Sequence, residues 1–216
     1  MSSEMKKYAK FAESSYSMIN DGIKSRDERK SATKATLQSG WDMMSGSTSK
    51  RSVFINEKEK EIVISHRGTN VKDVRDIKAD ISIATGTALS SARFQKAISQ
   101  DAKTKAKYKP LGYKIVVVGH SLGGMISYES GKANKLKTYT YNAASTPSVL
   151  GTVVSTDKIK KVLGVESKKD KMARKNITQY NTKFDPVSIT SRLKNATNVQ
   201  VKQKKNKDSH TIANFT

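Results

Sequence analysis

Apolar and polar residues follow each other in blocks that predict both helices and strands. Near the start, apolar side chains recur at every third or fourth position, which predicts an amphipathic helix over residues 4–19. Two β-like runs follow, Ser52–Ile55 and Glu61–Ser65, with a polar stretch between them. This arrangement is typical of a β-hairpin.

The middle of the chain carries the clearest strand. From Lys114 the sequence continues Ile-Val-Val-Val, an unbroken β-branched run that is typical of a strand buried on both faces, as in a parallel sheet. Before it, apolar positions from Phe94 to Ala102 predict a helix of about 15 residues that ends before Pro110. After it, a helical pattern begins around Gly123.

Three further elements are predicted downstream. Residues 137–142 and 177–180 are typical of strands, and Thr146 with Pro147 suits the N-cap and first turn of another helix. Strands and helices thus alternate, which predicts a three-layer α/β fold with a mostly parallel central sheet flanked by helices. No repeat and no linker rich in Pro, Gly or Ser interrupts the pattern, so we expect residues 1–216 to form a single domain.

The charge of the chain is strongly unbalanced. Its 216 residues, 35% of them hydrophobic, carry 41 basic and 19 acidic side chains, for a formal net charge of +22. Such an excess favours contact with polyanions, either anionic lipid headgroups or nucleic acid, although a solubilising lysine-rich surface also explains it. Most of the excess is Lys rather than Arg, and no nucleic-acid motif is present, so we expect peripheral contact with an anionic membrane rather than nucleic acid.

Several classes of protein are excluded by what the sequence lacks. There is no cysteine, which excludes disulfides, thiol catalysis and cysteine metal sites. No run approaches the roughly 18 apolar residues of a membrane span, so no transmembrane segment is expected. No apolar signal core follows Met1. We therefore expect the protein to be cytoplasmic, or released or packaged (for example in a virion) without a secretion signal.

The strongest chemical signal is the run Gly119-His-Ser-Leu-Gly123, which matches Gly-x-Ser-x-Gly. It lies between a buried strand and a helix, the setting of a nucleophile elbow. The sharp turn lifts the hydroxyl of Ser121 clear of the sheet and aims the N–H of Leu122 at the substrate oxygen. We predict that Ser121 is a nucleophile and that Leu122 contributes to an oxyanion hole.

A serine hydroxyl is a weak nucleophile near neutral pH and needs a base, for which the chain offers three histidines. His120 adjoins Ser121, so its side chain should point away from the hydroxyl and serve as a packed, hydrogen-bonded residue of the elbow. His66 ends an upstream strand. His210 lies far downstream, in the chain order Ser, acid, His that the elbow predicts. Elimination and order both select His210 as the general base.

The base needs an acid to orient its ring, placed between Ser121 and His210. The candidates are Glu129, Asp157, Glu166, Asp170, Asp185 and Asp208. Asp185 is favoured because it follows the strand predicted at 177–180 and precedes Pro186, which places it in a loop at the carboxyl end of a strand. Of the others, Glu129 falls on the helix after the elbow. Asp157, Glu166 and Asp170 lie in lysine-dense stretches, where surface ion pairs explain them. Asp208 is only two residues before His210, too close for a comfortable side-chain contact.

A second oxyanion donor is expected where an earlier strand ends. The run His66-Arg-Gly-Thr69 is at such an end, and Thr69 offers both its N–H and its hydroxyl. The alternative is a simple turn containing glycine.

These segments, in this order, resemble the class 3 lipases, the fungal-lipase-like branch of the α/β hydrolases. The matching segments are residues 66–70, 117–124, 141–144, 181–187 and 208–210. The resemblance implies hydrolysis of acylglycerol or phospholipid esters through an acyl-enzyme, with no metal and no cofactor. It also implies that Thr69 is an oxyanion donor and that Asp80 closes a lid segment.

The resemblance places that lid at residues 71–80. Val71, Val74 and Ile77 recur there at helical spacing among charged residues, which predicts a short amphipathic helix with a thin apolar stripe. Lids of well-studied members of the family typically present bulky apolar residues to an oil surface. A phospholipid or a small soluble ester is therefore favoured over triacylglycerol.

The main hypothesis is a serine carboxylic-ester hydrolase of the lipase or phospholipase type, phospholipase A1 included, that cleaves lipid acyl esters at an anionic membrane surface. The alternative is a non-catalytic lipid- or polyanion-binding protein on a hydrolase scaffold, because a fold does not guarantee activity. The intact set of Ser121, Asp185 and His210 argues against this alternative, since a binding protein has no chemical need for all three.

Overall fold

A computed structural model describes residues 2–17, 39–68, 92–144, 175–185, 187 and 196–216. The helices are α1 (Ser3–Ser17), α4 (Ala92–Tyr108) and α5 (Leu122–Asn134), with short 3-10 turns η2 (Lys109–Leu111) and η4 (Ile212–Asn214). The strands are β1 (Asp42–Met43), β2 (Arg51–Asn56), β3 (Glu61–His66), β4 (Lys114–His120), β5 (Lys137–Tyr141), β6 (Ile177–Thr182) and β7 (Thr197–Val201). Thr69, the predicted lid and the helix predicted at Thr146 lie outside the described residues.

The strands form one seven-stranded sheet in which spatial order follows chain order. β1, β2 and β3 pair antiparallel, and the expected hairpin brings Ile55 opposite Ile62. From β3 to β7 every pair is parallel. The prediction of an α/β fold with a mostly parallel sheet is confirmed.

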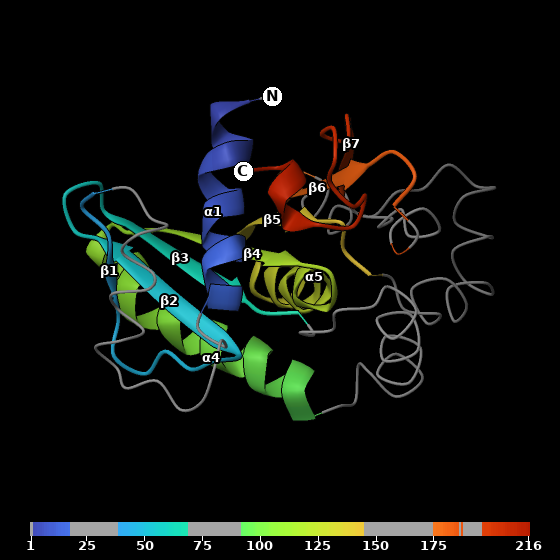
Figure 1. Ribbon diagram of the computed structural model, residues 1–216. Coiled ribbons are helices and arrows are strands. Elements are labelled where there is room, and N and C mark those ends of the chain that lie inside the picture. The colour runs from blue at the N-terminus through green and yellow to red at the C-terminus, as the bar shows by residue number, and fades with distance from the viewer. Residues whose placement is uncertain (1, 18–38, 69–91, 145–174, 186, 188–195) are drawn as a thin grey trace.

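The strand β4 is buried on both faces, as its unbroken apolar run predicts. Val116 and Val118 pack in one core cluster with Tyr8 of α1, whereas Ile115 and Val117 belong to a second cluster on the other face. Figure 1 shows α1 across one side of the sheet and α4 and α5 on the other. The sheet is therefore the middle of three layers.

A buried carboxylate fastens α1 to the sheet. Glu61 of β3 accepts hydrogen bonds from Tyr8 Oη at 2.5 Å and Lys7 Nζ at 2.6 Å, and it pairs with Lys114 Nζ at 3.0 Å. Burial alone would raise the pKa of Glu61, but these three partners lower it. The charge is thus paired rather than isolated, which fixes the first turns of α1 beside the amino ends of β3 and β4.

Two strands were not predicted. β7 has only Val199 and Val201 as apolar residues, and most of its side chains are exposed. It lies at an edge of the sheet, where a strand needs little apolar periodicity. β1 contains only two residues. Within the described ranges, no helix is long and apolar enough to cross a membrane.

Candidate active site

The residue Ser121 stands at the sharp turn between β4 and α5. Its backbone angles are φ 58° and ψ −128°, a conformation that residues other than glycine rarely adopt. Its N–H donates to the carbonyl of Tyr141 at 3.0 Å, and its own carbonyl accepts from the N–H groups of Met125 and Ala144, each at 3.2 Å. The strained turn is thus held by the elements on both sides, as expected of a nucleophile elbow.

The glycines around this serine are required by close backbone contact. A Cβ atom on Gly119 would lie 2.6 Å from Ser127 Oγ, and one on Gly123 would lie 2.7 Å from the backbone nitrogen of Gly68. Real Cβ atoms essentially never come this close to another heavy atom. The motif therefore has glycines because β3 and α5 meet here with no room for side chains.

The structure brings the three predicted catalytic side chains together. His210 Nε2 lies 3.0 Å from Ser121 Oγ, and His210 Nδ1 lies 2.7 Å from Asp185 Oδ1. All three are buried. They come from the segments that follow β4, β6 and β7, so they meet at the carboxyl ends of parallel strands. This is the edge where α/β sheets build their sites.

Asp185 is the carboxylate that reaches the histidine ring. Its Oδ1 also accepts the backbone N–H of Val187 at 3.3 Å. Asp208, a rejected candidate, instead accepts the backbone N–H of His210 at 2.7 Å. Glu129 lies on α5, where burial raises its pKa, and the remaining candidates lie outside the described residues.

The side chain of His120 contacts the main chain of His210. Its Nε2 lies 2.6 Å from the backbone carbonyl oxygen of His210, and its Nδ1 lies 3.0 Å from the hydroxyl of Tyr16. Burial, together with the nearby His210, lowers the pKa of His120 to about 3. The ring is therefore neutral, with its proton on Nε2 facing a carbonyl and its Nδ1 accepting from the Tyr16 hydroxyl.

Two supporting residues were missed by sequence reasoning. Tyr16 stood out only as one apolar position of the first helix. Asn142, directly after β5, accepts the N–H of Thr182 at 2.9 Å and donates to the carbonyl of Ser209 at 2.9 Å. Thr182 Oγ1 also donates to that carbonyl. Asn142 thus ties the loops that carry Asp185 and His210, a role that no local sequence signal reveals.

The end of β3 lies against the elbow, where the oxyanion hole is predicted. A Cβ atom on Gly68 would be 2.8 Å from the carbonyl oxygen of His120 and 3.4 Å from Ser121 Cβ. Leu122 opens α5, so its N–H is among those with no partner inside the helix. Thr69 follows Gly68 directly but is outside the described ranges, so its part in the hole remains a prediction.

His66 belongs to a different buried cluster. Its Nε2 lies 2.8 Å from Asp101 Oδ2, and Asp101 also accepts from Arg51 Nε at 2.8 Å and Ser130 Oγ at 2.5 Å. Burial alone would raise the pKa of Asp101, but His66 and Arg51 lower it. These contacts link β2, β3, α4 and α5. Within the described ranges, no group of three or more His, Cys, Asp or Glu side chains is arranged to hold a metal.

Comparison with known families covers almost the whole chain. Residues 7–214 match the family model of the Tle-like phospholipase domain, which is described as phospholipase-like. No protein with a curated description matches the sequence.

Solved structures with a similar fold are lipases of fungi. A mutant form of MDLA from Penicillium cyclopium aligns with a TM-score of 0.56 at 16% identity, over 98% of this chain and 85% of its own. The mono- and diacylglycerol lipase from Aspergillus oryzae aligns with a TM-score of 0.52 at 18% identity, over 99% and 84%. Nonglycosylated LIP2 lipase from Yarrowia lipolytica aligns with a TM-score of 0.53 at 16% identity, over 85% and 72%. With the family match, these folds confirm the predicted resemblance to fungal-type lipases.

Proposed function

Because the chain belongs to the Tle-like phospholipase domain family, we propose that it is a serine hydrolase that cleaves acyl esters of phospholipids through an acyl-enzyme. The observation that supports this most directly is the position of the His210 ring. One nitrogen lies 3.0 Å from Ser121 Oγ and the other lies 2.7 Å from Asp185 Oδ1. This is the relation of nucleophile, base and orienting acid that acyl transfer needs.

The first half of the reaction forms the acyl-enzyme. Ser121 Oγ attacks the ester carbonyl carbon while His210 Nε2 takes the hydroxyl proton. Asp185 accepts the Nδ1–H of His210, which fixes the tautomer and offsets the positive charge of the ring. The N–H of Leu122 and the donors of Thr69 stabilise the developing oxyanion. His210 then gives the proton to the departing alcohol oxygen, and the C–O bond breaks.

The second half releases the acyl chain. Water attacks the acyl-enzyme carbonyl as His210 Nε2 removes its proton, and the proton returns to Ser121 Oγ as the acid leaves. The products are a fatty acid and an alcohol, which is a lysophospholipid when the substrate is a phospholipid. In this proposal, both halves of the reaction use the same nucleophile, base, acid and oxyanion donors.

The proposed substrate surface is an anionic membrane. The net charge of +22 would concentrate the protein at anionic lipid headgroups. Because exposed charges are screened by salt, vesicle binding should weaken as ionic strength rises. The family description supports a phospholipid substrate.

The decisive test is product analysis with mixed phosphatidylglycerol and diacylglycerol vesicles, alongside nitrophenyl esters of short and long chains. We expect wild-type protein to release fatty acid and Ser121→Ala to release none above background. Ser99→Ala changes an exposed serine on α4 and is the matched control.

A fluorophosphonate probe separates the enzyme from the alternative binding protein. The probe should label wild-type protein and Ser99→Ala but not Ser121→Ala. Lipid binding without labelling or ester hydrolysis would contradict the proposal and favour a non-catalytic lipid-binding protein.

A further inference from the structure

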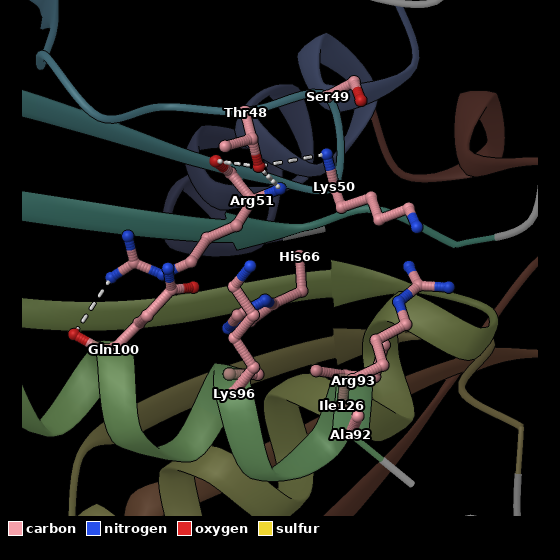
Figure 2. Close-up of a pocket in the computed structure, with 11 residues that line it drawn as sticks. Thr48, Ser49, Lys50, Arg51, His66, Ala92, Arg93, Lys96, Gln100 and Ile126 are labelled. Atoms are coloured by element: carbon pink, nitrogen blue, oxygen red, sulfur yellow. Dashed lines mark hydrogen bonds between the residues drawn. The ribbon is translucent and has the colours of Figure 1, made fainter.

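A second feature of chemical interest is a basic cavity of about 480 Å³ beside the end of β3. It opens between the segment that precedes β2 and the first turns of α4. Figure 2 shows side chains from both segments extending into the space between them. The four cationic residues that line the cavity are Lys50, Arg51, Arg93 and Lys96.

The positive charge of this cavity is poorly balanced. Asp101, buried behind it, pairs with Arg51 at 2.8 Å and also with His66 at 2.8 Å. In the described part of the chain, no carboxylate pairs with Lys50, Arg93 or Lys96 at salt-bridge distance. The cavity therefore carries three cations with no counter-charge among these residues.

Arg93 is the least exposed of these three cations. It is half-buried, and its Nη2 donates to the backbone carbonyl of Arg67 at 2.5 Å. Burial and the neighbouring guanidinium of Arg67 both lower the pKa of Arg93. A buried charge is costly unless it is paired, so an anion in the cavity would stabilise this arrangement.

The cavity also lies close to the elbow. The carbonyl that Arg93 binds belongs to the residue just before Gly68, and Gly68 packs against Ser121. Figure 2 shows Lys50 and Arg93 extending toward each other on one side of the cavity. An anion held between them would lie on the same side of β3 as α4 and α5.

We propose that this cavity binds a phosphate group, held by the guanidinium of Arg93 and the ammonium groups of Lys50 and Lys96. A guanidinium matches two phosphate oxygens at once, and ammonium groups add compact charge. The phosphate is that of a phospholipid headgroup, in which case the inference rests on the proposed function, or it is free phosphate. In the first case the cavity selects phospholipids over neutral glycerides.

The test measures binding without turnover. In the Ser121→Ala background, a Lys50→Ala/Lys96→Ala double variant is compared with Lys58→Ala/Lys103→Ala. The control pair is exposed, lies outside the cavity and removes the same charge. Calorimetry at low ionic strength uses three probes: inorganic phosphate, monomeric dihexanoyl phosphatidylglycerol and dihexanoylglycerol. Thermal unfolding of each variant verifies that it is folded.

We expect the cavity variant to bind phosphate roughly tenfold more weakly than its parent, and the control pair to stay within about twofold. A parallel loss for phosphatidylglycerol, but not for dihexanoylglycerol, identifies the headgroup as the source. A loss for inorganic phosphate alone identifies free phosphate. Equal losses in both double variants, or no phosphate binding by the parent, would overturn the inference.

Failure of this inference is distinguishable from failure of the proposed function. If wild-type protein hydrolyses esters but the Ser121→Ala parent binds no phosphate, only the cavity assignment fails. If phosphate binding responds as expected but wild-type protein hydrolyses no ester, only the proposed function fails.

Discussion

The side chain of His120 is joined to the main chain of His210 by a hydrogen bond of 2.6 Å from Nε2 to the carbonyl oxygen. The two rings are also close, with centroids 4.8 Å apart. The residue next to the proposed nucleophile therefore positions the proposed base. Since His120 is neutral, it holds His210 without competing for the proton that the reaction transfers.

We predict that His120→Leu lowers kcat and leaves KM for a soluble ester nearly unchanged. The leucine cannot donate to the His210 carbonyl, so the base loses part of its orientation while the substrate contacts remain. We expect a loss of roughly 10- to 100-fold, the range known for removing the hydrogen-bond partners that orient metal-binding histidines. His120→Gln keeps a donor and should restore part of kcat. A rise in KM alone, or no rescue by glutamine, would argue against positioning.

The free energy of unfolding should depend on pH through His120. Burial lowers the pKa of His120 from 6.5 to about 3, so below pH 6.5 the unfolded chain binds a proton that the folded chain does not. The free energy of unfolding therefore falls as the pH decreases from 6.5 towards 3, and His120 contributes at most about 1.4 kcal/mol per pH unit to this slope. Urea unfolding between about pH 7 and about pH 5 should give a smaller pH slope for His120→Gln than for wild type. Equal slopes would contradict this.

The choice of acid can be tested with a matched pair of substitutions. Asp185→Asn removes the charge that offsets the His210 imidazolium and disturbs its tautomer, so kcat should fall roughly 10³- to 10⁴-fold. Asp208→Asn changes a carboxylate that accepts the backbone N–H of His210, a bond that the asparagine oxygen can still accept, and should cost less than about tenfold. Both are measured as kcat on a soluble ester. A larger loss of kcat for Asp208→Asn than for Asp185→Asn would indicate that Asp208 is the acid that orients His210.

Much of this site could be predicted because its chemistry is local in sequence. The elbow is visible from a buried strand, a glycine-flanked serine and a helix. With only three histidines in the chain, elimination left His210, and chain order then favoured Asp185. The structure places these residues in contact, although their catalytic roles remain predictions.

The remaining parts of the site arise only from tertiary packing. Tyr16 reaches His120 across 104 positions of the chain, and Asn142 joins two loops that follow different strands. His66 Nε2 lies 2.8 Å from a carboxylate oxygen of Asp101, on a helix whose other residues show ordinary periodicity. No repeated spacing marks such partners, because each contact depends on how separate elements meet.

The close approach of β3 to the elbow predicts a steric effect on folding. An alanine Cβ at position 123 would lie 2.6 Å from the carbonyl carbon of Arg67, which is backbone and cannot rotate away. Gly123→Ala should therefore lower the free energy of unfolding by about 2 kcal/mol or more and reduce ester hydrolysis. Gly46→Ala, at φ 83° with open space around it, should cost only about 1 kcal/mol of backbone strain. Denaturant unfolding of both variants compares these costs, and equal costs would rule out the steric account.

One exposed aromatic side chain stands beside the site. Phe184, next to Asp185, is 67% exposed. Its φ of 80° is a backbone conformation that residues other than glycine rarely adopt. Lys183 Nζ lies 5.2 Å from the ring centroid. An aromatic ring with an adjacent cation is suited to the interface between anionic headgroups and acyl chains.

The proposed membrane contact predicts that Phe184→Ser weakens partitioning onto phosphatidylglycerol vesicles roughly fivefold, because the ring no longer leaves water on binding. Leu111 offers a matched control, since it is 60% exposed but lies in η2, which precedes β4, whereas Ser121 follows β4. Leu111→Ser should therefore bind vesicles as the wild type does. Vesicle sedimentation measures partitioning, and hydrolysis of a short soluble ester reports whether the site is intact. Equal weakening by both substitutions would show that exposed apolar area, rather than the edge that carries Ser121, governs membrane contact.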